Sequence, residues 1–174
     1  THSYYSFLES LLSPEAIVNT ALRYNLKTLG LTDHRYLSGA VEFYETCKNN
    51  HIKPIIGLDV DISYKGFPGL LTLFAIDLAG WSNLSRLSSL LLGQENKLRI
   101  TTLNDHRDGL LCTCGDSKGV LRKLIRNSTH AAKLPDLLLS DLSMIFKDNF
   151  YVEIQRYATG PLKNEETLLT VCRL

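Results

Sequence analysis

Residues 28–62 constrain the fold of this chain more than any other stretch, because they predict a strand, a helix and a second strand in immediate succession. The first apolar run ends on Asp33 and His34, and a segment with apolar residues at helical spacing follows it. A second apolar run, with a proline at its start, ends on Asp59. Because α/β barrels carry their chemistry at the C-terminal ends of parallel strands, we expect these three side chains to meet at one mouth.

The rest of the chain continues the alternation of strands and helices. Further strands are predicted at residues 70–76, 109–113 and 150–155, and helices near Pro14, Gly80, Val120, Pro135 and Lys163. The glycines and proline of residues 66–69 predict a loop before the third strand. About five such alternations predict an α/β, barrel-like fold with a parallel sheet.

Size and composition limit the classes of protein that this chain can belong to. With 174 residues and 44% hydrophobic content, it can bury one core, and nothing in it indicates a second domain. The net charge of +1 excludes the strongly basic surface of an autonomous nucleic-acid binder. Four cysteines without a paired framework predict reduced thiols and a cytoplasmic location, and no apolar run is long enough to cross a membrane.

Residues 32–60, TDHRYLSGAVEFYETCKNNHIKPIIGLDV, resemble the early part of the PHP (polymerase and histidinol phosphatase) domain. The intact GAVEFY and KPIIG motifs resemble those of one branch of this family, the PHP domains of bacterial DNA polymerase III alpha subunits and error-prone DNA polymerases. This resemblance implies a distorted, seven-stranded (βα)7 TIM-like barrel. It also implies that residues 1–174 form a single PHP domain that is incomplete at both ends. The missing parts are the first half of the first metal motif and the final D-x-H strand.

The resemblance implies a site for up to three divalent metal ions, typically zinc, manganese or iron, and metal-assisted hydrolysis of phosphoesters. Asp33 and His34 are then the candidate catalytic residues. The candidate metal ligands are His2, Glu9, Asp33, His34, Asp59 and Asp116.

This chain departs from the family pattern at several of these positions. Glu9 is longer than the family's aspartate, and Asp59 is shorter than the family's glutamate. Asp116 stands where the family has a cysteine, and Tyr157 stands where it has a histidine. Since metal sites lose affinity with each altered ligand, we predict a degraded site that holds little or no metal.

Arg35 replaces the glycine that follows TDH in the family. Its guanidinium could pair with Asp33 or Asp59 and take over charge that a metal once balanced. Without the resemblance, a second interpretation of the Asp33–His34 pair is favoured: the pair caps the next helix and holds a loop in place.

Two further groups have simple structural interpretations. Cys112 and Cys114 lie two apart on a predicted strand, which indicates buried free thiols rather than a metal site. Arg122, Lys123 and Arg126 share a helix with apolar residues, so we expect them on its solvated side.

Three functions follow from these observations. The first is the PHP domain of a DNA polymerase III alpha-type chain, acting as a scaffold. The family then implies contacts with the polymerase domains of the parent chain, docking of a proofreading exonuclease, only indirect contact with DNA, and none with a membrane. Residual 3′–5′ exonuclease activity stays open. The alternative is a free-standing metal-dependent phosphoesterase acting on small phosphates or oligonucleotides, and the third is an interaction domain without chemistry.

Overall fold

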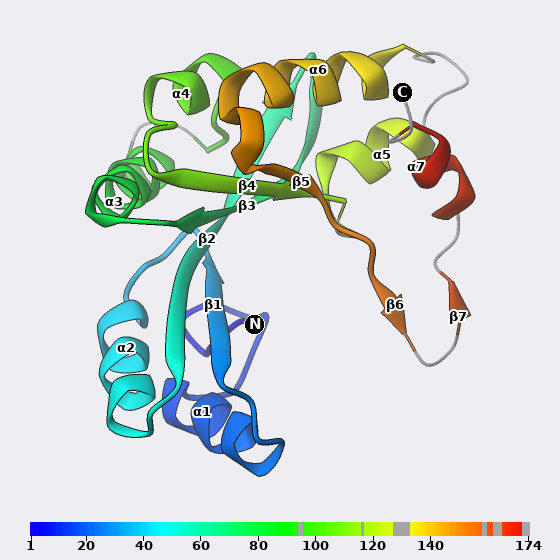
Figure 1. Cartoon of the computed structure of the whole chain (residues 1–174). Helices are drawn as coiled ribbons and strands as arrows, with labels where there is room; N and C mark the ends of the chain where they lie inside the picture. The colour runs from blue at the N-terminus through cyan, green and yellow to red at the C-terminus, as the bar shows by residue number, and fades with distance from the viewer. Residues whose placement is uncertain (94–95, 116, 127–132, 158–159, 162–164, 172–174) are drawn as a thin grey trace.

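The computed structural model describes residues 1–93, 96–115, 117–126, 133–157, 160–161 and 165–171 (Figure 1). Its strands are β1 (Thr28–His34), β2 (Lys53–Tyr64), β3 (Phe67–Ala75), β4 (Leu110–Cys114), β5 (Phe150–Val152), β6 (Arg156–Tyr157) and β7 (Gly160–Pro161). Its helices are α1 (Pro14–Arg23), α2 (Ala40–Asn49), α3 (Leu78–Gly93), α4 (Ile100–Asp105), α5 (Val120–Arg126), α6 (Leu134–Phe146) and α7 (Glu165–Val171), with a 3-10 turn at Lys147–Asn149.

The first five strands form one sheet in the order β1-β2-β3-β4-β5, and β6 and β7 form a separate ribbon. β1 pairs with β2 and β4 pairs with β5 in parallel, whereas β3 is antiparallel to both of its neighbours. Four strands therefore run in one direction, and β3 is reversed. The α/β, barrel-like fold is confirmed, but the expectation that every strand is parallel is wrong at β3.

A hairpin explains why β3 is reversed. β2 does not end at Asp59 as predicted but continues to Tyr64, and the predicted loop at residues 66–69 is reduced to a tight turn. Lys65 and Gly66 have φ angles of 49° and 88°, as required at the two central positions of a type I′ hairpin turn. Two residues with positive φ are therefore enough to send β3 back along β2.

The helices cover the sheet in two groups, each with its own core. α1 and α2 enclose a smaller cluster with β1, and they lie together at the lower end of Figure 1. α3, α5 and α6 enclose the larger cluster with β2, β3 and β4. None of the helices in the described part of the chain has the length and apolar character of a membrane span.

Local sequence signals account for several of these elements. α1 begins as predicted, because the Ser13 side chain accepts a hydrogen bond from the Ala16 backbone N–H at 3.0 Å and Pro14 occupies the first turn. Among the described residues, Cys47, Cys112 and Cys114 are buried and form no disulfide, which confirms the interpretation of Cys112 and Cys114 as buried thiols rather than a metal site. Cys172 lies outside the described residues.

The expectation that Arg122 lies on the solvated side of its helix is wrong. This residue is only 4% exposed, and its Nε donates to the Gly115 carbonyl at 2.9 Å.

β2 separates the core from the candidate site by simple alternation. Leu58, Val60 and Ile62 are fully or almost fully buried in the larger core. Side chains of a strand point alternately to opposite faces, so Asp59 and Asp61 point away from that core. The candidate site therefore lies on the sheet face opposite the one that α3, α5 and α6 cover.

Candidate functional site

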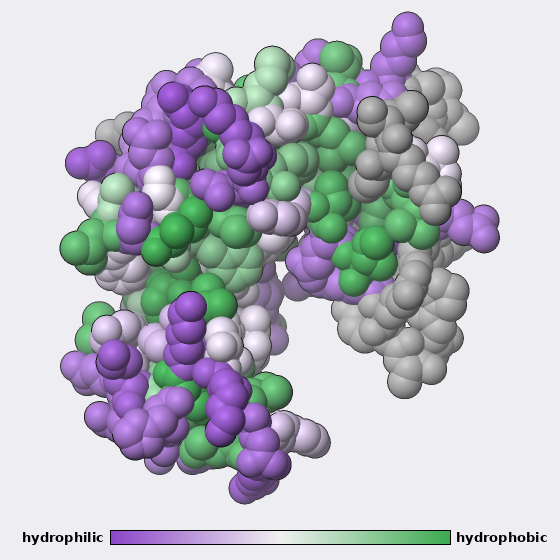
Figure 2. Space-filling model, viewed as in Figure 1, coloured by the Kyte–Doolittle hydropathy of each residue, from purple (hydrophilic) through white to green (hydrophobic). Residues whose placement is uncertain are grey.

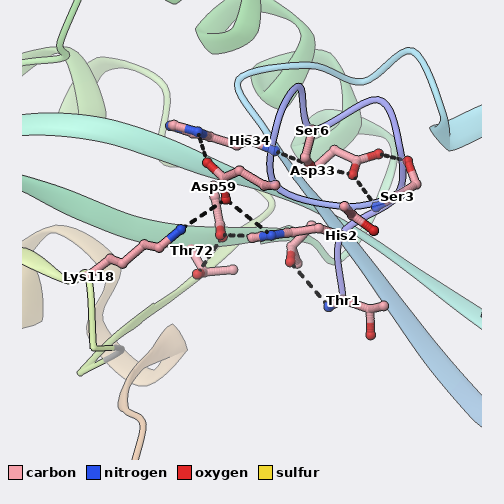
Figure 3. Close-up of polar contacts among 12 residues, drawn as sticks. Thr1, His2, Ser3, Ser6, Asp33, His34, Asp59, Thr72 and Lys118 are labelled. Carbon is pink, nitrogen blue, oxygen red and sulfur yellow. Dashed lines mark hydrogen bonds and ion pairs between the residues drawn. The ribbon is translucent and has the colours of Figure 1, made fainter. Parts of the chain in front are cut away.

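Five imidazole and carboxylate side chains gather on this open face of the sheet. His34 ends β1 and pairs in register with Asp59 of β2, so both side chains point the same way. Asp61 lies two residues further along β2. The N-terminal segment brings His2 over the strand ends (Figure 3), and Glu9 of the same segment contacts both His2 and His34. We call this set, His2, Glu9, His34, Asp59 and Asp61, the histidine–carboxylate cluster.

The cluster is a continuous chain of polar contacts. Glu9 touches both imidazoles, at 2.7 Å from Oε1 to Nδ1 of His34 and 3.4 Å from Oε2 to Nδ1 of His2. The other ring nitrogen of His34 lies 2.8 Å from Oδ2 of Asp61. The other ring nitrogen of His2 lies 2.9 Å from Oδ2 of Asp59. Both imidazoles thus bridge the N-terminal segment to β2.

Three further groups engage the cluster carboxylates. The Thr72 hydroxyl on β3 donates to Oδ1 of Asp59 at 2.6 Å. The Lys118 ammonium donates to Oε2 of Glu9 at 3.2 Å. Arg35 Nε donates to Oδ2 of Asp61, so its carboxylate partner is neither Asp33 nor Asp59, and the expectation for Arg35 is wrong in that respect. Two fixed cations therefore lie against the cluster.

The pKa values reflect this mutual pairing. Hydrogen bonding to Asp61 raises the pKa of His34, and the nearby Glu9 adds to this effect against the opposing effect of burial. Burial works to raise the pKa of Asp61, but hydrogen bonds from His34 and Arg35 outweigh it and hold that pKa below its ordinary value. Glu9 behaves in the same way, with Lys118 and His34 outweighing burial to lower its pKa. The charged forms of all three groups are favoured.

Asp33 lies on the opposite face from His34, because adjacent strand residues point to opposite sides. It is only 2% exposed. Its carboxylate accepts hydrogen bonds of 2.6 Å from the Ser3 backbone N–H, the Ser3 hydroxyl and the Ser6 hydroxyl. Ser6 in turn accepts the His34 backbone N–H at 3.0 Å. Asp33 therefore anchors the N-terminal segment to β1, which agrees with the loop-holding part of the second interpretation. The helix-capping part is wrong, because α2 begins after Gly39 without a side-chain cap.

The structure thus brings together four of the residues predicted for the site, His2, Glu9, His34 and Asp59, and does not bring Asp33 to them. Asp116 and the side chain of Tyr157 lie outside the described residues. Sequence reasoning missed Asp61, although the spacing Asp59-x-Asp61 on one strand is the signal that could have found it.

A mixed cavity lies beside the cluster. Its volume is about 390 Å³, and its lining includes His2, Asp59 and Thr72 together with Glu153 and Gln155. Gln155 donates to Oε1 of Glu153 from its side-chain amide. Carboxylates therefore face this cavity from both β2 and the chain that follows β5.

The family implies a divalent metal ion, so the fit of the residues to such an ion can be tested. Imidazoles and carboxylates are ligands that zinc and manganese accept. In this arrangement, however, both ring nitrogens of His2 and of His34 contact carboxylates of the cluster. Arg35 and Lys118 place positive charge against two of the same carboxylates. Among the described residues, no three His, Cys, Asp or Glu side chains are placed to hold a metal ion. As arranged, the cluster does not fit a divalent metal.

Solved structures with the same architecture define the class of fold. A candidate metal-dependent phosphoesterase from Bifidobacterium adolescentis matches with a TM-score of 0.60 at 13% identity, covering 99% of this chain and 81% of that one. An amidohydrolase from Chromobacterium violaceum matches with a TM-score of 0.53 at 11% identity, covering 87% and 83%. This chain therefore shares with them an α/β, TIM-like barrel in partial form.

The model of the PHP domain family matches residues 1–157, and this chain belongs to that family. The DNA polymerase III subunit alpha of Rickettsia bellii is 34% identical over 164 residues, which cover 90% of this chain and 14% of the relative. The subunits alpha of Chlamydia muridarum and Bacillus subtilis are 32% and 30% identical over 177 and 173 residues. This chain spans about 14% of the length of such relatives.

Proposed function

We propose that this chain is the PHP segment of a DNA polymerase III alpha-type polymerase and acts there as a structural domain rather than as a hydrolase. In this proposal residues 1–174 form a single domain of a longer cytoplasmic chain. Support for the polymerase context comes from the similarity to several alpha subunits over nine-tenths or more of this chain.

The observation that carries the structural role is the internal charge balance of the histidine–carboxylate cluster. Arg35 on Asp61 and Lys118 on Glu9 supply two of the positive charges that bound cations supply in a phosphoesterase site. Arg35 also adopts a φ angle of 66°, in the left-handed region that favours glycine. This backbone conformation is unfavourable for an arginine, and the contact of the guanidinium with Asp61 offsets the conformational free energy.

A domain exchange tests the polymerase context. The segment of Bacillus subtilis DNA polymerase III subunit alpha that matches this chain is replaced by residues 1–174, and DNA synthesis and expression as a soluble protein are measured. The hybrid is expected to fold and to retain DNA synthesis, whereas a deletion of the same segment is expected to lose both. A hybrid no better than the deletion would refute the proposed context.

A hydrolysis assay tests the structural role against the alternative of a free-standing phosphoesterase. The purified chain is incubated with bis-p-nitrophenyl phosphate and with single-stranded oligonucleotides in the presence of Mn²⁺ or Zn²⁺. No turnover above that of a His34→Ala variant is expected. Turnover in the unmodified chain that His34→Ala abolishes would favour the phosphoesterase.

The similarity to DNA polymerase III alpha subunits also supports a proposal for the partners of this chain. The polymerase domains of the parent chain are the first expected partners, and a proofreading exonuclease subunit is the second. DNA is expected to be contacted only indirectly, because basic and acidic residues balance to a net charge of +1.

A further inference from the structure

The layer of helices on the sheet has a gap between α2 and α3. β2 and β3 are joined by the two-residue turn at residues 65–66, so no helix is inserted between these strands as it is in a βαβ unit. α2 packs on β1 and β2, and α3 packs on β2 and β3. Between the two helices lies a groove of about 580 Å³, which we call the α2–α3 groove.

The α2–α3 groove is lined mainly by apolar side chains. Pro54 and Ile56 of β2 line it with Ala75 of β3, and Val41 and Tyr44 of α2 face Leu78 and Trp81 of α3 across it. Figure 2 shows apolar surface at this waist, between the lower part of the molecule with α2 and the upper part with α3. Val41 is 61% exposed and Leu78 is 86% exposed. Apolar side chains grouped in this way are typical of a binding surface.

The charge of the groove selects the kind of partner. Its described lining contains two acids, Glu45 and Asp77, and no basic residue. Asp77 accepts the Gly80 backbone N–H at 2.8 Å with one oxygen and so caps the start of α3. Glu45 is exposed on α2. A partner that fills the groove therefore gains by bringing a positive charge to its rim.

We propose that the α2–α3 groove binds an amphipathic helix of a partner protein, with aliphatic side chains on one face and lysine or arginine beside them. A helix fits because the element that this layer lacks is a helix, and helices in grooves present apolar residues at positions i, i+3, i+4 and i+7. An added strand does not fit, because β2 is already paired with β1 on one edge and β3 on the other. This inference does not rest on the proposed function.

Trp81 is the single tryptophan of the chain and lines the groove, so its fluorescence reports occupancy directly. The probes are two synthetic peptides of about 18 residues, long enough to form a helix. Both carry leucine at helical spacing, one with lysine on the flanks and one with glutamate. The lysine peptide is expected to shift the Trp81 emission in a saturable way, with at least about tenfold higher affinity than the glutamate peptide.

Variants of the full 174-residue chain locate the binding. Val41→Gln is expected to weaken the lysine peptide about tenfold, whereas Met144→Gln is the matched control. Met144 is an exposed apolar residue of another helix, at 66% exposure. Glu45→Lys leaves Asp77 facing one new lysine in the described lining, so it is expected to remove most of the preference for the lysine peptide. The proposal is overturned by no Trp81 response to the lysine peptide, by equal affinity for both peptides, or by unchanged binding in Val41→Gln.

Discussion

At the scale of single residues, two neighbours on one strand do different work. Asp33 faces the N-terminal segment and holds it through Ser3 and Ser6. His34 faces the histidine–carboxylate cluster and holds the same segment through Glu9. The N-terminal segment is therefore fastened to β1 on both faces of the sheet.

Replacing Asp33 by alanine tests whether this side chain anchors the N-terminal segment to β1. The variant leaves three buried donors without their acceptor, and hydrogen bonds to charged groups are among the stronger ones. We expect a loss of about 3 kcal/mol in the free energy of unfolding, measured by urea denaturation. We also expect faster proteolytic cleavage near Leu8, which is 91% exposed.

Asp105→Ala is the control for this variant, because Asp105 is exposed and ends α4. An acid at a helix C-terminus opposes the helix dipole, so its removal is expected to be neutral or slightly stabilising. A similar loss in both variants, or no loss in Asp33→Ala, would show that Asp33 does not anchor the segment.

The contact of His34 with Glu9 and Asp61 predicts a dependence of the free energy of unfolding on pH. The pKa of His34 is raised in the folded state, so its contribution is fully present below the unfolded value of about 6.5 and is lost as pH rises through the folded pKa. The pKa values of Glu9 and Asp61 are lowered. Their contributions are present above about pH 4 and are lost as pH falls through the folded pKa values.

We therefore expect the free energy of unfolding, measured in metal-free buffer, to decline as pH rises above about 6.5. His34→Asn should flatten this decline. His51→Asn is the matched control, since His51 is exposed and asparagine tolerates its φ angle of 57°. Equal slopes in the two variants would assign the dependence to other groups.

The alternation of side chains along a strand is the sequence signal that predicts most of the candidate site. Alternation along residues 32–34 already separates Asp33 from His34, and alternation along residues 59–61 already pairs Asp59 with Asp61. The contacts of Lys118 could not be foreseen, because its contact with Glu9 joins positions 109 residues apart. Such contacts depend on how the whole sheet curls, and no local pattern records that.

At the scale of secondary-structure elements, the start of α3 depends on a close approach between two backbones. A side-chain carbon at Gly80 would lie well inside van der Waals contact with the carbonyl oxygen of Gly109. Gly109 itself has a φ angle of 71° at the entry to β4. Neither backbone can yield without displacing α3 from the sheet.

Gly80→Ala is therefore expected to destabilise the chain by at least about 2 kcal/mol in thermal or urea denaturation, as overpacking does. Gly93→Ala provides a control in the same helix, because a side-chain carbon there meets nothing within 4 Å. The control is expected to be neutral or to stabilise by up to about 1 kcal/mol. Comparable stabilities of the two variants would mean that the close approach does not constrain α3.

Most elements follow from the sequence, and the exceptions have physical causes. α1, β1, α2, β4, α5 and α6 lie where apolar periodicity and capping residues predict them. The reversal of β3 was missed because the continuous apolar run at residues 70–76 predicts burial and not direction. The turn residues Lys65 and Gly66 carry the direction, and a lysine is not a strong signal for positive φ.

At the scale of the whole molecule, the balance of charge around the cluster decides what the open face can bind. Glu9, Asp59 and Asp61 bring three carboxylates, and Arg35 and Lys118 bring two permanent cations. Protonation of His34 is favoured as well. A divalent cation entering this site must therefore displace charges that the chain already supplies, which opposes its binding.

The last prediction concerns metal content. After incubation with Zn²⁺ or Mn²⁺ and desalting, the purified chain is expected to hold less than one tightly bound ion per molecule by elemental analysis. The double variant Arg35→Gly, Lys118→Ala removes both competing cations and relieves the positive φ of residue 35. It is expected to bind more Zn²⁺ than the unmodified chain, and saturation at about 100 times the dissociation constant would stabilise it by about 2.7 kcal/mol.

A double variant at exposed cations outside the cluster, Lys27→Ala with Arg107→Ala, should leave the metal content unchanged. Two or three ions bound to the unmodified chain would mean that the cluster rearranges to admit metal and that its internal ion pairs are weak. No gain in the Arg35→Gly, Lys118→Ala variant would mean that ligand length at Glu9 and Asp59, rather than competing charge, prevents metal binding. The comparison therefore separates competing charge from ligand length as the physical cause of weak metal binding.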